Sequence, residues 1–108
     1  MAVASAEIAP PLLDWSGARR GLDLASQVGY FLEDQGETRP VPILGGFVAE
    51  AHSGDCVHVF WRLPGPPAFL AARRRRNLRR YVRLLRSWGM ATQLHLDAPE
   101  PYLACSIR

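Results

Sequence analysis

An arginine-rich amphipathic segment between residues 70 and 88 constrains the fold of this 108-residue chain more than any other feature. Eight arginines fall within the fourteen positions from Arg73 to Arg86, and no acidic residue lies among them. On a helical wheel the apolar side chains gather in a stripe about 120° wide. They are Leu70, Ala71, Leu78, Tyr81, Val82, Leu85 and Trp88. The pattern predicts a helix over residues 67–88, ended by Gly89, with the stripe packed on a sheet.

The arginines occupy the side of this helix opposite the apolar stripe. They are Arg73, Arg75, Arg76, Arg79, Arg80, Arg83 and Arg86. Arg74 falls inside the stripe near the helix start, and we expect its side chain to extend outward. Seven arginine pairs are spaced three or four residues apart. Their repulsion, about 1.5–3.5 kcal/mol at low salt, is a sizeable part of a small domain's stability of ~5–15 kcal/mol, so an anionic partner would stabilise the helix.

Charge is divided unevenly along the chain. Residues 1–62 hold four arginines and eight acidic residues, a net charge of −4, whereas residues 63–108 hold nine arginines and two acidic residues, a net charge of +7. All thirteen basic residues are arginine, which indicates a GC-rich coding genome but does not account for the clustering. Three anionic partners therefore remain open: nucleic acid, an acidic protein surface, or the acidic first half of the chain itself. The acidic residues of that half that fall within the predicted domain are Asp23, Glu33, Asp34, Glu37, Glu50 and Asp55.

The segment before the arginine-rich helix predicts one helix and one β-hairpin. Residues 24–35 carry an apolar helical face, with Asp23 as the N-cap and Gly36 just beyond the end. Two β-rich runs, at about 41–50 and 55–63, flank the sequence HSGD, which predicts a turn. Gly45 and Gly46, inside the first run, indicate a bulge or a close approach of the backbone.

A second hairpin is predicted at the C-terminus, where ATQLHLD and YLACSIR alternate around APEP. We therefore predict an α+β fold of order α-β-β-α-β-β, with two helices packed on an antiparallel sheet. Residues 1–20 are expected to form a flexible or extended arm, and residues 21–108 a single domain. The N-terminus lacks the features of a secretory signal and no apolar run approaches the ~20 residues of a membrane span, so we expect a cytoplasmic protein without membrane contact.

Alternation along residues 55–63 assigns side chains to two faces of the sheet. One face receives Val57, Val59, Trp61 and Leu63, and the other receives Cys56, His58, Phe60 and Arg62. Cys56 and Cys105 are expected to lie on opposite faces and to stay reduced. Phe60 and Tyr102 are expected on the face that the arginine-rich helix leaves uncovered. The helix at 24–35 covers them, or they are single exposed aromatics, or they form a stacking platform or a dimer surface; we favour dimerisation slightly.

Metal and catalytic sites receive little support from the sequence. Cys56, His58, His95 and Asp97 could share one sheet face, but with His52 they match no standard zinc spacing. His52, Ser53 and Asp55 crowd one short turn, where a nucleophile, base and orienting acid cannot easily align. We expect no catalytic residue, no metal and no cofactor.

The sequence thus predicts a small non-enzymatic protein that binds the phosphate backbone of DNA or RNA, with little base selectivity. The arginines on the outer side of the helix, Arg73 to Arg86 without Arg74, would make the contacts, and Arg62 would flank them. The alternative is a homodimeric protein-interaction or regulatory module that places the same basic face on an acidic partner.

Overall fold

The computed structural model describes residues 23–64 and 70–107, which form two helices and a four-stranded antiparallel sheet. The elements are α1 (Leu24–Asp34), β2 (Gly46–Ser53), β3 (Cys56–Arg62), α2 (Leu70–Ser87), β4 (Met90–His95) and β5 (Tyr102–Ile107). The predicted α+β class and element order are confirmed. The predicted arm at residues 1–20 and the predicted helix start at residues 67–69 lie outside the described residues. Neither described helix is long and apolar enough to cross a bilayer.

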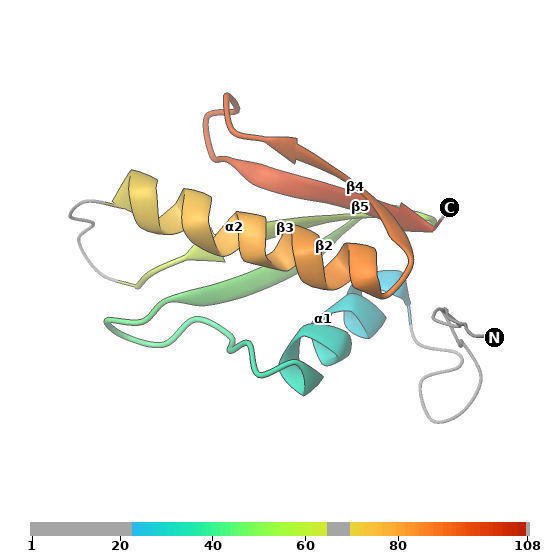
Figure 1. Ribbon diagram of the computed structural model, residues 1–108, viewed down its shortest axis with the longest axis horizontal. Helices are drawn as coiled ribbons and strands as arrows, with labels where there is room; N and C mark the ends of the chain where they lie inside the picture. The colour runs from blue at the N-terminus through green and yellow to red at the C-terminus, as the bar shows by residue number, and fades with distance from the viewer. Residues whose placement is uncertain (1–22, 65–69, 108) are drawn as a thin grey trace, which may run out of the picture.

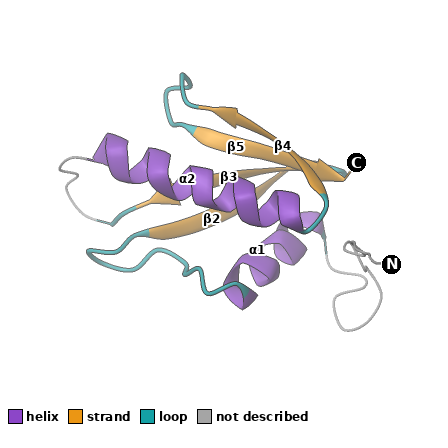
Figure 2. Cartoon of the chain, in the orientation of Figure 1, coloured by secondary structure: helices purple, strands orange, loops and turns teal. Residues whose placement is uncertain are grey.

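The sheet has the strand order β2-β3-β5-β4, and every neighbouring pair is antiparallel. Figure 1 shows both helices against the same face of the sheet, with α2 crossing it lengthwise and α1 beside the β2 edge. Figure 2 shows the resulting two layers, one of helix and one of strand. In the described part of the chain, no helix covers the second face of the sheet.

The core lies between these layers and is built from alternate residues of the strands. Trp61, Val57 and Val59 of β3 are at most 1% exposed, and Phe47, Met90, Leu103 and Cys105 join them from the other strands. The helices contribute Leu24, Val28 and Leu32 from α1 and Leu78, Tyr81 and Leu85 from α2. Burial of an aliphatic side chain of this size contributes about 1.5–3 kcal/mol. The predicted apolar stripe of α2 therefore attaches the helix to the sheet, except for Ala71, which is exposed.

Local interactions set the ends of both helices. The Ser26 backbone N–H donates to Asp23 Oδ1 at 2.7 Å, and this hydrogen bond lowers the pKa of the Asp23 carboxyl group. Gly36 follows α1 with φ of 91°, and Gly89 follows α2 with φ of 103°. Glycine adopts this left-handed conformation without the penalty of a side chain, so both predicted stops are confirmed.

Strand β2 begins five residues later than predicted, at Gly46 instead of residue 41. Pro40 and Pro42 lack the backbone N–H that a ladder needs, which excludes this stretch from the sheet. A Cβ atom on Gly46 would collide with the backbone of Thr38 and Arg39. The predicted close approach is thus confirmed, while the register shift of the hairpin lies elsewhere, between Ala51 and Ser53.

Gly45 and Gly36 offer a matched test of how the fold uses glycine. Both have positive φ, but a Cβ on Gly45 would lie 2.6 Å from Trp61 Cζ2, whereas a Cβ on Gly36 would have no neighbour within 4 Å. We expect Gly36→Ala to lower the free energy of unfolding by about 1–2 kcal/mol. Gly45→Ala should lower it by about 2–5 kcal/mol, because overpacking adds to the backbone strain. Urea denaturation measures both; equal losses would contradict the close contact.

Candidate nucleic-acid interface

Four arginines on the outer side of α2 have exposed side chains without an ion pair or hydrogen bond to any other described residue. They are Arg75, Arg76, Arg79 and Arg83, and we call them the arginine ridge. Because an α-helix rises about 1.5 Å per residue, Arg75, Arg79 and Arg83 follow one another at intervals of about 6 Å. The buried stripe on the other side of α2 holds this row in one orientation.

Arg80 differs from the ridge because a carboxylate of the same chain already neutralises it. Its Nε and Nη2 atoms donate to the two carboxylate oxygens of Glu37, both at 2.7 Å. The Glu37 side chain is 12% exposed. The paired hydrogen bonds raise the pKa of the Arg80 guanidinium, and they fasten the segment after α1 to α2. Internal neutralisation, one of the three predicted outcomes, therefore applies to this arginine.

Arg73 and Arg86, at the two ends of the predicted set, bind neutral acceptors. Arg73 Nη2 donates to the Ile43 carbonyl oxygen at 2.8 Å, and its guanidinium lies 5.3 Å from the Trp61 ring centroid. Arg86 Nε donates to Thr92 Oγ1 at 2.7 Å. Neither contact removes the positive charge, so both side chains add to the potential around the ridge.

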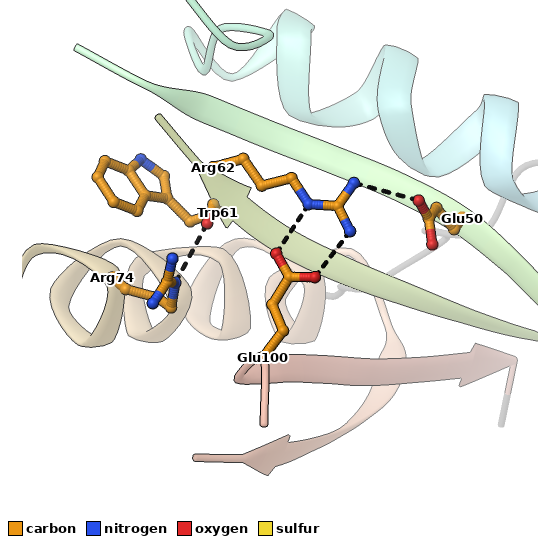
Figure 3. Close-up of polar contacts among 5 residues, drawn as sticks. All are labelled: Glu50, Trp61, Arg62, Arg74 and Glu100. Carbon is orange, nitrogen blue, oxygen red and sulfur yellow. Dashed lines mark hydrogen bonds and ion pairs between the residues drawn. The ribbon is translucent and has the colours of Figure 1, made fainter. Parts of the chain in front are cut away.

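Two further arginines lie away from the ridge, and Figure 3 shows their contacts. Arg74 is half-buried, and its Nε donates to the Trp61 carbonyl oxygen at 3.3 Å instead of reaching freely into solvent. Arg62 lies on the sheet face opposite the helices, where Nε and Nη2 each donate to Glu100 at 2.8 Å. Nη1 also donates to Glu50 at 3.3 Å. The expectation that Arg62 flanks the phosphate contacts is therefore wrong, because the sheet separates it from the outer side of α2.

The Arg62 contacts connect three parts of the second sheet face. Glu50 is on β2, Arg62 is on β3 and Glu100 is in the turn before β5. The hydrogen bonds from Arg62 lower the pKa of Glu100 and raise that of Arg62. The guanidinium also lies 4.6 Å from the Phe60 ring centroid, which adds a cation–π contact.

A stack of aromatic rings crosses all four strands on this second face. His52 and His58 have centroids 4.2 Å apart, His58 and Tyr102 are 4.4 Å apart, and Tyr102 and His95 are 4.7 Å apart. Phe60 lies beside the stack, 5.6 Å from Tyr102. The prediction that Phe60 and Tyr102 lie on the sheet face that the arginine-rich helix leaves uncovered is confirmed. The alternative that α1 covers them is wrong. The stacked ring faces contact one another, so mainly ring edges remain for a partner.

The residues considered for metal binding and catalysis do not converge. The Tyr102 ring separates His58 from His95 in the stack. Over residues 23–64 and 70–107, no group of three or more His, Cys, Asp or Glu side chains is placed to hold a metal ion. Ser53 Oγ donates to Asp55 Oδ1 at 3.1 Å. Both cysteines are free, as predicted, and burial raises the pKa of the Cys105 thiol to about 12, which leaves it unreactive.

Sequence reasoning missed a surface feature next to the arginine ridge. Ile43 is 80% exposed and Leu44 is 65% exposed, in a loop that the sequence predicted as the start of a strand. The signal was present in Pro40 and Pro42, which do not fit a paired strand. No periodicity indicated that the apolar side chains after them would point into solvent.

The histidine stack predicts a pH-dependent stability. Partial burial is the main cause that lowers the pKa of His58 below 6.5, with further lowering by His52 and His95 and a smaller opposing effect from Glu50. The unfolded chain then binds the proton more readily, so stability is full above the unfolded pKa and falls as pH drops toward the folded pKa. We expect the free energy of unfolding to fall between about pH 7 and pH 5.

The variant His58→Phe keeps an aromatic ring between His52 and Tyr102 but removes the titrating group. Urea denaturation across this pH range should therefore show a smaller loss of stability for His58→Phe than for the unchanged protein. The same pH dependence in both proteins would exclude His58 as its source.

The chemistry of these surfaces has to be inferred from their own residues. A scan against protein-family models, a search of curated proteins and a search of solved structures each found no match to this chain. The clearest chemical feature is then the arginine ridge, whose four exposed guanidinium groups have no ion pair with another described residue.

Proposed function

We propose that this protein binds the phosphate backbone of nucleic acid through the arginine ridge of α2. The observation that supports this function is the exposure of Arg75, Arg76, Arg79 and Arg83 without an ion pair to any carboxylate in the described part of the chain. A guanidinium presents several N–H donors in a plane and binds phosphate oxygens in pairs. Four such groups on a helix that the core holds rigidly form a preorganised surface for a polyanion.

The remaining predicted arginines have unequal parts in this function. Arg73 and Arg86 keep their charge and extend the positive surface beyond the ridge. Arg80 contributes least, because Glu37 opposes its charge and accepts hydrogen bonds from its Nε and Nη2. Contacts of this kind read charge and backbone shape instead of base edges, so the binding is weakly selective for sequence.

Electrostatic binding of this type has a characteristic salt dependence. Each phosphate that the protein neutralises releases condensed counterions, and the logarithm of the binding constant falls with that of salt concentration by about 0.9 per contact on duplex DNA. If each of the four ridge arginines neutralises one phosphate, the slope is about −3.6.

A second function is favoured by the ring stack on the other face of the sheet. His52, His58, Tyr102 and His95 lie on a face that neither described helix covers, with Phe60 beside them. Partly exposed aromatic side chains of this kind are common at protein interfaces. The alternative is a dimeric interaction module, in which this face joins two copies and the arginine ridges bind an acidic protein.

Arg79→Gln and Gln93→Glu form a matched pair that tests the nucleic-acid function. Each lowers the net charge by one, but Arg79 belongs to the ridge and Gln93 is exposed on the opposite sheet face. Each protein is titrated into fluorescent duplex DNA, single-stranded DNA and RNA at several salt concentrations. The binding constants give the slope of their logarithm against the logarithm of salt concentration. Arg79→Gln should reduce its magnitude by about one unit on duplex DNA, and Gln93→Glu should leave it unchanged.

Two outcomes would contradict this function. The first is an absence of binding to every oligonucleotide at low salt. The second is an equal effect of Arg79→Gln and Gln93→Glu, which would mean that net charge and not the ridge drives the association. Concentration-dependent dimerisation without oligonucleotide binding would favour the alternative module.

A further inference from the structure

The loop between α1 and β2 carries an apolar tip formed by Ile43 and Leu44, whose side chains are 80% and 65% exposed. Pro42 is exposed next to them, and Val41 is 37% exposed. Exposed apolar residues that stand singly need no explanation, but adjacent ones at a loop tip indicate a contact surface. In this chain they stand beside the most strongly charged helix.

This tip is held in a tight and strained conformation. The Leu44 N–H donates to the Pro42 carbonyl oxygen at 2.8 Å, and the Gly45 N–H donates to the Val41 carbonyl oxygen at 2.8 Å. Ile43, at the centre of the first turn, has φ of 72°, a conformation that a β-branched residue rarely adopts. Glycine or asparagine would relieve the strain at this position. The backbone therefore holds a bulky aliphatic side chain outward at an energetic disadvantage.

Arginines of α2 fix the loop beside the ridge. Arg73 binds the carbonyl oxygen of Ile43, and Arg80 binds Glu37 at the other end of the loop. Arg76 lies three residues after Arg73 and four before Arg80, so it occupies the same side of α2 and remains exposed. The apolar tip thus stands next to a free member of the arginine ridge.

We propose that Ile43 and Leu44 form a wedge that inserts between stacked bases while the arginine ridge binds the adjacent phosphates. This inference rests on the proposed nucleic-acid function and adds a second contact to it. Small apolar wedges, including Ile and Leu, separate base steps in architectural proteins that bind the minor groove of DNA. Charge complementarity favours nucleic acid, since the free arginine beside the tip suits a phosphate that flanks the opened step.

Rigidity also favours this partner over a lipid surface. Flexible and rigid apolar segments both insert into an anionic bilayer, so binding to a bilayer would not require the strained turn at Ile43. Separation of two stacked bases requires a wedge that keeps its conformation when it is inserted. A small preformed tip meets that requirement. The step opened most easily is a flexible pyrimidine–purine step.

The test uses a short duplex with 2-aminopurine at a central pyrimidine–purine step, because this base brightens when it is unstacked. The full chain should bind and increase the fluorescence. Ile43→Asn and Ile43→Asn with Leu44→Asn should reduce affinity by about 3- to 10-fold and abolish the increase, since the tip can no longer open the step. Asparagine tolerates the left-handed backbone, so thermal unfolding should show Ile43→Asn to be at least as stable as the unchanged chain.

Ile107→Asn is the matched control, because Ile107 is another exposed aliphatic residue, 41% exposed, at the end of β5. It should leave both affinity and fluorescence increase unchanged. Binding with the expected salt slope but without a fluorescence increase in the unchanged chain would overturn the wedge and leave the ridge function standing. Failure to bind any oligonucleotide would overturn both. Binding to anionic lipid vesicles that is lost in the double variant, without oligonucleotide binding, would assign the tip to a membrane surface instead.

Discussion

The burial of Leu78, Tyr81 and Leu85 of α2 against the sheet is the interaction on which the rest of this structure depends. A helix with this many arginines repels itself by a few kcal/mol, and the apolar stripe offsets that repulsion by leaving water. The same burial fixes the rotation of the helix about its axis. Charge that would be diffuse on a free peptide is therefore presented as a row on one side of a rigid element.

Intramolecular contacts then divide the arginines of α2 into two groups. Arg73, Arg74, Arg80 and Arg86 fasten α2 to the loop before β2, to β3 and to β4, while the arginine ridge has no partner in the described part of the chain. Among the described residues, Arg80 alone of the α2 arginines pairs with a carboxylate, so most of the positive charge of the helix is not neutralised there. The contacts that fasten the loop also hold its apolar tip next to the ridge, which joins a cationic and an apolar element on one surface.

The two faces of the sheet are stabilised by different interactions. The face under the helices excludes water through close apolar packing around Trp61 and Val59. The other face is held by the ring stack and by Arg62 with its two carboxylates, interactions that tolerate partial exposure. Arg62 shows why a positive charge alone does not assign a residue to a binding surface. Its charge is opposed by Glu50 and Glu100, which are 12 and 38 residues away in the chain.

The sequence by itself determined the helices, the two hairpins, the faces of β3 and the side of α2 that carries the arginines. Each follows from interactions among neighbouring residues or from a periodicity of side chains, which a linear pattern records. Only the tertiary structure decided that Glu37 pairs with Arg80, that Arg62 lies behind the sheet, and that the Ile43 side chain is exposed beside α2. Those outcomes depend on which distant segments meet in space, and the chain's local preferences do not encode that information.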